Sequence, residues 1–299
     1  MNKDAYKEYL SDFRKSLDFL GIKKSDIVYV GSDIAGIVVK AKSELEFKGK
    51  QEQFLFLDGL IDTLKAQVSE EGTLLFPVYS WDFCRGKGFD YYKTKGEVGA
   101  LNNYILDNRN DFKRTKHPIY SFMVWGKEAD MLLSYDNQEA WGEASIFSYL
   151  HENKAKELDL NVTATRSMTF KHYVEQKVKV PYRYPKFFCG IYTDSEGVSE
   201  YRTYSMYVRD LSVELEPAQT NEFFNEGGAG KSIGFRGWNI HVIELDKAFD
   251  LLREDLLFNG GKNVYSFGNY CLEGKKFDND RYEVGFLKDR KLVNLPEGN

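Results

Sequence analysis

Helical and strand-like segments alternate twice near the N-terminus, and this alternation constrains the fold more than any other feature. Residues 4–20 carry apolar side chains at helical spacing, and the β-branched run Ile27–Val30 follows them. The pattern repeats, with helical spacing over 52–68 and then a short strand over Thr73–Phe76 that Pro77 is expected to end. Helix and strand in alternation predict an α/β layered fold.

The rest of the chain continues in the same manner, without an internal repeat, a low-complexity tract or a clear linker. The spacing predicts helices over 97–112, 145–156, 169–178 and 245–257. It predicts strands over 119–125 and, with alternating Tyr and polar residues, from 182 through Tyr207, and a strand or loop over Leu158–Thr165. We therefore expect one domain spanning residues 1–299.

Charge and cysteine content exclude several classes of function. The net charge of -5 provides no basic field to attract nucleic acid. No apolar run is long enough to insert into a membrane, and the N-terminus lacks the apolar stretch of a secretory signal. Three cysteines, far apart and in no metal spacing, indicate reduced thiols (Cys84, Cys189 and Cys271). These features predict a cytoplasmic protein.

Two glycine- and histidine-containing motifs fail on inspection. The segment Gly227–Ser232 resembles a phosphate-binding loop, but Asn225 stands where the Walker pattern requires glycine, so a flexible loop is predicted. A metal site is rejected because the four histidines offer no second ligand pair at zinc-like spacing.

The segment Ser167–Glu175 carries the most chemical information. Thr169 is a good N-cap for the helix that follows, which would place His172 in the first turn. The helix dipole disfavours imidazolium there, so the ring stays neutral and can accept a proton. Glu175 lies three residues further on the same face and could orient the ring. An ordinary capped helix with a surface histidine explains the same pattern equally well.

Five segments, in this order, resemble the aminoglycoside 3-N-acetyltransferase family. The first is a strand that runs into a Ser-containing turn (Ser25–Ser32), and the second is a Gly-Thr-Leu segment that ends in Pro (Glu71–Pro77). The third is a His-Pro motif followed by Ser (Arg114–Ser121), and the fourth is a turn from Gly to Ser (Gly142–Ser145). The fifth has Thr, His and Glu at intervals of three residues (Thr169–Glu175). The resemblance is good over residues 10–180 and weak beyond, so the C-terminal part from about 187 is expected to be more divergent.

The resemblance implies a mixed central sheet with helices on both faces and direct transfer of an acetyl group from acetyl-CoA, without an acyl-enzyme. It implies His172 as general base, Glu175 as its partner, and Thr169 as a helix cap and a candidate to polarise the thioester carbonyl. Ser32, His117 and Ser121 would line the coenzyme A site. A structural role for His117, which precedes Pro118 and could fix a loop, remains equally open.

Departures from the family pattern bear on the substrate. Gly31, Asp33 and Val78 replace residues usual in the family, and Arg166 stands where aminoglycoside enzymes place an Asp. A base at that position argues against a polycationic drug as acceptor.

The acceptor is expected to be an amino sugar linked to a nucleotide, as in polysaccharide or O-antigen biosynthesis. The stretch Lys171–Lys186 is basic in an acidic chain and interleaves Tyr with these bases. Arg183 suits a pyrophosphate, while Tyr182 and Tyr184 suit a base or sugar ring. The alternative is that these bases form a solvated face or bind the phosphates of coenzyme A.

Two further hypotheses stay open on the sequence. The first is transfer of a formyl or a longer acyl group. The second is a non-catalytic protein that binds a sugar or nucleotide on the same scaffold. In each case the partner is a small molecule, and the sequence also leaves a homodimer open.

Overall fold

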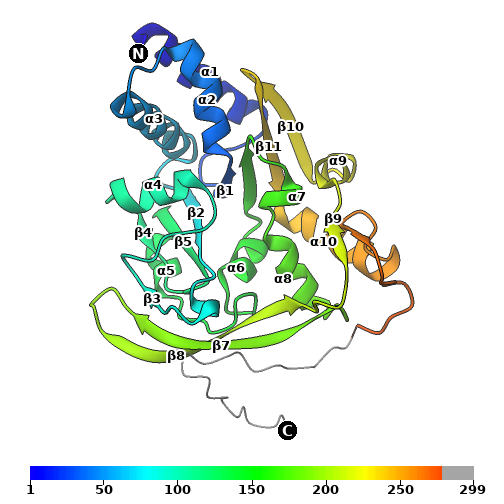
Figure 1. Cartoon of the computed structure of the whole chain (residues 1–299). Coiled ribbons are helices and arrows are strands. Elements are labelled where there is room, and N and C mark those ends of the chain that lie inside the picture. Colours follow the sequence, from blue (N-terminus) through cyan, green and yellow to red (C-terminus); the bar gives the residue numbers. More distant parts are fainter. Residues whose placement is uncertain (278–299) are drawn as a thin grey trace.

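The computed structural model describes residues 1–277, and a seven-stranded mixed sheet lies at its centre (Figure 1). The strands follow the order β10-β11-β6-β1-β2-β5-β4. β1 is parallel to both of its neighbours, β2 and β6, and the remaining pairs are antiparallel. The bounds are β1 Ile27–Ser32, β2 Thr73–Tyr79, β4 Lys113–Arg114, β5 Tyr120–Gly126, β6 Lys156–Leu160, β10 Gly230–Phe235 and β11 Trp238–Glu244.

Helices cover both faces of this sheet, as expected. Alternate residues of β1 point to opposite sides, so Val28 and Val30 belong to one apolar cluster and Tyr29 to the other. The first cluster includes α1 Lys3–Phe19, α2 Ile34–Leu45, α3 Lys50–Val68 and α4 Ala100–Asn108. The second includes α6 Ile146–Glu152, α8 Phe170–Lys177 and α10 Leu245–Phe258.

A second, smaller sheet closes one end of the molecule. Its long hairpin consists of β7 (Arg183–Thr193) and β8 (Ser199–Arg209), and β3 (Phe89–Asp90) adds to β7. A separate two-stranded pair joins β9 (Leu215–Pro217) to β12 (Tyr265–Phe267). The remaining short helices are η1 Phe83–Arg85, α5 Ala129–Ser134, α7 Ala164–Ser167 and α9 Thr220–Glu226.

Some boundaries differ from those predicted. β2 does not end at Pro77 but continues to Tyr79, because its pairing with β1 stops at Leu75 and beyond this point only β5 is its partner. Proline is tolerated where a strand lacks one neighbour. The predicted loop over Gly227–Ser232 is confirmed only for residues 227–229, since Gly230 begins strand β10.

Helix α2 was not predicted, because its sequence is rich in β-branched residues that also suit a strand. It forms directly after β1, where the Asp33 side chain accepts a hydrogen bond from the Gly36 amide at 3.1 Å. This is the bond of an N-cap residue. Helices α4 and α6 are shorter at both ends than the predicted 97–112 and 145–156.

Strand β6 carries two acidic residues, Glu157 and Asp159, into the apolar layer. Both are fully buried, and none of their carboxyl oxygens has a hydrogen-bond partner within residues 1–277. Burial raises the pKa of Asp159 to about 7 and that of Glu157 well above its usual range. Each carboxyl is therefore more easily protonated in the folded chain than in the unfolded one.

We expect Asp159→Asn to change the pH dependence of stability. The raised pKa of Asp159 stabilises the fold in acid, and this contribution is lost as pH rises towards 7, at about 1.4 kcal/mol per pH unit. Asn cannot ionise. The free energy of unfolding of the variant, relative to that of the wild type, should therefore rise by about 2–3 kcal/mol from pH 5 to pH 7. Urea unfolding at several pH values measures this gain.

The exposed Asp130→Asn variant is the control and should keep a constant difference from the wild type. A constant difference for Asp159→Asn as well would show that this carboxyl has a similar pKa in the folded and unfolded chains.

Candidate active site

Helix α8 places the predicted histidine and its carboxylate partner. His172 lies in the first turn of the helix, as predicted from the sequence. Thr169 occupies the N-cap position, but its backbone is helical (φ -69°, ψ -24°) and its side chain makes no capping hydrogen bond. The predicted capping role of the Thr169 hydroxyl is therefore wrong, and this side chain instead lines a cavity.

His172 and Glu175 form a short charged hydrogen bond. The Nδ1 atom of His172 lies 2.6 Å from Oε2 of Glu175, and the carboxylate is fully buried while the His172 side chain remains 22% exposed. Because a carboxylate only accepts, Nδ1 carries the proton and Nε2 keeps its lone pair. The indole ring of Trp141 packs against the imidazole at a centroid distance of 5.3 Å.

Tyr182 and Arg183, which follow α8 in the chain, also contact Glu175. The Tyr182 hydroxyl donates to Oε1 at 2.7 Å, and Nε of Arg183 lies 2.8 Å from Oε2. Nη1 of Arg183 also donates to the carbonyl of Tyr207 on β8 at 3.2 Å. The sequence had suggested Tyr182 and Arg183 as acceptor contacts; the structure instead buries both against Glu175.

Burial and a neighbouring positive charge keep His172 neutral. Burial, and after it the Arg183 guanidinium, lower the pKa of His172 to about 4, although the charge and the hydrogen bond of Glu175 act in the opposite direction. Although burial opposes its ionisation, Arg183 and His172 hold the pKa of Glu175 well below its usual range. At neutral pH the pair is thus a neutral imidazole hydrogen-bonded to a carboxylate, which is the state of a general base.

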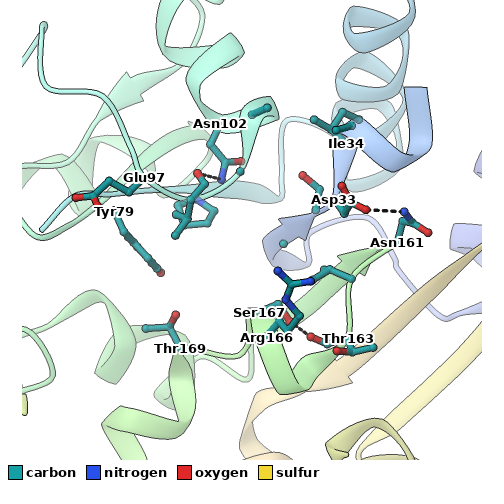
Figure 2. A pocket seen from close by; sticks show the side chains of 18 of the residues that line it. Asp33, Ile34, Tyr79, Glu97, Asn102, Asn161, Thr163, Arg166, Ser167 and Thr169 are labelled. Atoms are coloured by element: carbon teal, nitrogen blue, oxygen red, sulfur yellow. Dashed lines mark hydrogen bonds between the residues drawn. The ribbon is translucent and has the colours of Figure 1, made fainter. Parts of the chain in front are cut away.

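A cavity of about 570 Å³ opens at the carboxyl ends of the parallel strands β6, β1 and β2. Open α/β sheets bind ligands at this edge. The first residues of α2 and α4 and the segment from Asn161 to Thr169 complete its wall. In Figure 2, Tyr79, Glu97 and Thr169 lie towards one side, and Asp33 and Asn161 lie towards the other.

The predicted donor-site residues divide into two groups. Ser32 lines the cavity, together with Thr169. His117 and Ser121 do not: the His117 ring is buried and its Nδ1 accepts from the Tyr120 amide at 3.1 Å, while Ser121 donates to the carbonyl of Val78 at 2.9 Å. Burial lowers the pKa of His117 to about 3, so it is a neutral residue that fixes its loop.

Other cavity residues had no clear signal in the sequence. Tyr79, Glu97 and Asn161 line the wall but belong to no segment of the motif pattern. Arg166 also lines the cavity, and it was noticed in the sequence only as a departure from the family. Tyr184, the third predicted acceptor contact, is buried on β7.

Within residues 1–277 no group of three His, Cys, Asp or Glu side chains is arranged to hold a metal ion. In the same part of the chain no helix combines the length and the apolar character needed to cross a bilayer.

Comparison with known proteins identifies the family. The family model of aminoglycoside 3-N-acetyltransferase matches residues 46–256. No curated protein matches the chain by sequence.

Solved structures share the fold. Aminoglycoside acetyltransferase AAC(3)-Xa is 17% identical with a TM-score of 0.65, covering 82% of this chain and 91% of its own. AAC-IIIb, solved in a binary complex with CoASH, is 16% identical with a TM-score of 0.66, covering 82% and 94%. YokD from Bacillus subtilis is 20% identical with a TM-score of 0.62, covering 82% and 97%. The chain therefore belongs to the aminoglycoside 3-N-acetyltransferase family and is an acetyl-CoA-dependent N-acetyltransferase.

Proposed function

We propose that the enzyme acetylates the amine of an amino sugar and that His172 is the general base. One observation carries this proposal. A neutral imidazole, oriented by a buried carboxylate at 2.6 Å, lies one helical turn from Thr169, which lines the cavity at the sheet edge. The family supplies the reaction class, N-acetyl transfer from acetyl-CoA.

The reaction follows from the properties of these groups. The acceptor amine attacks the thioester carbonyl, and Nε2 of His172 takes the proton that the nitrogen loses. Glu175 stabilises the imidazolium that forms. The Thr169 hydroxyl, which makes no capping hydrogen bond, donates to the carbonyl oxygen as that oxygen becomes negative. The C–S bond then breaks, the acetyl group remains on nitrogen, and the coenzyme A thiolate leaves and can recover the proton from His172.

Acetyl-CoA is proposed to occupy the cavity at the sheet edge. Ser32 at the end of β1 and Ile34 and Ala35 in the first turn of α2 line this space. The thioester would then approach Thr169 from the cavity, while the amine approaches His172. His117 and Ser121 have no part in this arrangement.

The acceptor is proposed to be a nucleotide-linked amino sugar. With Tyr182, Arg183 and Tyr184 buried, the support for this substrate class moves to Arg166, whose exposed side chain lines the cavity. Arg166 suits a phosphate and would repel a polycationic drug.

His172→Gln should lower kcat by about 10²–10⁴, because Gln keeps a polar side chain of similar reach but cannot accept the proton. Steady-state kinetics with acetyl-CoA and an amine measure the loss. His151→Gln is the matched control: that ring contacts Tyr173 of the same helix but not Glu175, and its loss should leave kcat within a few-fold. A His172→Gln enzyme with normal kcat would rule out the base assignment.

Ala35→Trp should weaken coenzyme A binding by at least about tenfold, since Ala35 lines the cavity and an indole there would occupy the donor's space. Isothermal titration with coenzyme A measures the dissociation constant. Val39→Trp, one turn further along α2 at a site 72% exposed and outside the cavity, should bind normally. Equal binding by both variants would place the donor elsewhere.

A panel of amines with acetyl-CoA tests the acceptor. We expect kcat/KM to be higher for nucleotide-linked amino sugars than for kanamycin-type drugs, because Arg166 attracts phosphate and repels cations. Arg166→Asp should narrow or invert this preference, whereas the acid-to-amide control Glu97→Gln should not. Drugs that match or exceed every nucleotide sugar tried with the wild-type enzyme would refute this substrate class.

A further inference from the structure

Both carboxylate oxygens of Glu175 are in contact with polar side chains. Tyr182 donates to Oε1, while His172 and Arg183 both contact Oε2. The carboxylate is fully buried and therefore cannot rely on water for its remaining stabilisation. Two contacts on Oε2 and one on Oε1, each from a different side chain, hold the carboxylate with Oε2 directed at the imidazole.

The chain reverses direction to bring these groups back to the helix. After α8 ends at Lys177, the backbone of Lys179 is left-handed (φ 55°), and the amide of Val180 bonds to the carbonyl of Glu175 at 3.1 Å. Arg183 then begins β7, and its guanidinium is tied to the carbonyl of Tyr207 on the neighbouring strand. The position of Arg183 is therefore fixed both by the reversal after α8 and by the second sheet.

We propose that Arg183 is a positioning residue of the acetyl transfer: its fixed positive charge holds Glu175 ionised and in place, and at the same time prevents the imidazole from being protonated before the amine arrives. This inference rests on the proposed role of His172 as the base. It gives Arg183 a task distinct from contact with the acceptor.

The need for such a charge follows from the geometry. A buried carboxylate 2.6 Å from an imidazole favours the imidazolium, which has no lone pair with which to accept a proton. Arg183 shares the same carboxylate oxygen, so it cancels much of that attraction. The pKa of His172 accordingly falls to about 4, with burial as the largest cause and Arg183 as the next.

Other charged and titratable groups face the same cluster. On α8 the buried Lys171 also disfavours a charge on His172, in the same direction as Arg183 but as a smaller cause. The phenols of Tyr182, in the turn before β7, and of Tyr265, on β12, face Glu175. Burial raises the pKa of each, so both are uncharged at neutral pH. Arg183 is thus the principal cation that opposes Glu175.

The test is the pH profile of kcat/KM for the wild type, Arg183→Gln and Arg183→Lys. In Arg183→Gln the attraction of Glu175 for a charged ring loses its main opposing charge, so the acidic limb should move to higher pH by about one to two units. Activity should return to within a few-fold of the wild type above that limb. Arg183→Lys keeps the charge, so its limb should stay near that of the wild type.

Titration of ¹⁵N-labelled histidine by NMR gives the pKa of His172 without reference to activity. It should rise in Arg183→Gln by the same one to two units and stay in place in Arg209→Gln. Arg209 is the matched control: it pairs with Arg183 across the hairpin but bonds to the carbonyl of Val213 instead of to Glu175.

Each outcome has a distinct meaning. An equal loss of activity at every pH, with an unchanged His172 pKa, would show that Arg183 only supports packing and would overturn the inference. A shifted pKa together with a fully active His172→Gln enzyme would overturn the proposed base and leave the electrostatic role of Arg183 intact.

Should Arg183→Gln fail to fold, Glu175→Gln and the double variant Glu175→Gln/Arg183→Gln provide the complementary comparison. Arg183 acts on the ring only in the first of these, so the pKa of His172 should be higher in the double variant. An equal His172 pKa in the two variants would overturn the inference.

Discussion

The burial of one ionised carboxylate, Glu175, determines how the two sheets are joined. A fully desolvated charge must be matched by nearby donors and by an opposite charge. Helix α8 supplies only one of these, His172, and the others come from the turn into β7 and from the first residue of that strand. Packing of α8 against the second sheet is thus an electrostatic requirement as well as an apolar one.

The central sheet provides the other half of the site. Three parallel strands, β6, β1 and β2, end at one edge, and each leads into a segment that forms part of the cavity wall. Gly31 keeps this wall thin: a Cβ atom there would lie 2.7 Å from the Asp159 carboxyl and 3.0 Å from Ser167. The cavity and the buried acid pair of β6 are therefore separated by little more than backbone. The bound donor and the acetyl-accepting amine would meet where this edge approaches α8.

The sequence predicted the parts of this structure that depend on local patterns. Strand β1, helix α8 and the position of His172 within its first turn follow from periodicity and from a short motif. The location of Arg183 did not follow, because a base among tyrosines reads as an exposed binding surface, and only the backbone reversal after α8 directs it inward. Thr169 is a residue type that favours the N-cap position, yet its backbone is helical and its side chain makes no capping hydrogen bond. Glu97 reached the cavity through tertiary contacts that no local pattern records.

The residues of the charged cluster, His172 to Arg183, lie close together in the sequence, and this has a consequence for how the site evolves. Tyr182 and Arg183 follow Glu175 by only a few residues, so the proposed base His172, its carboxylate partner and the opposing positive charge are encoded on one short stretch of the gene. Such a stretch can pass between relatives by recombination without breaking its internal contacts, whereas the cavity wall is assembled from segments scattered over the first two thirds of the chain. Acceptor preference can drift by single substitutions in those scattered segments while the proton-handling unit is inherited intact. In related sequences, residues 175 and 183 should change together, and residues 97 and 166 should vary independently of them.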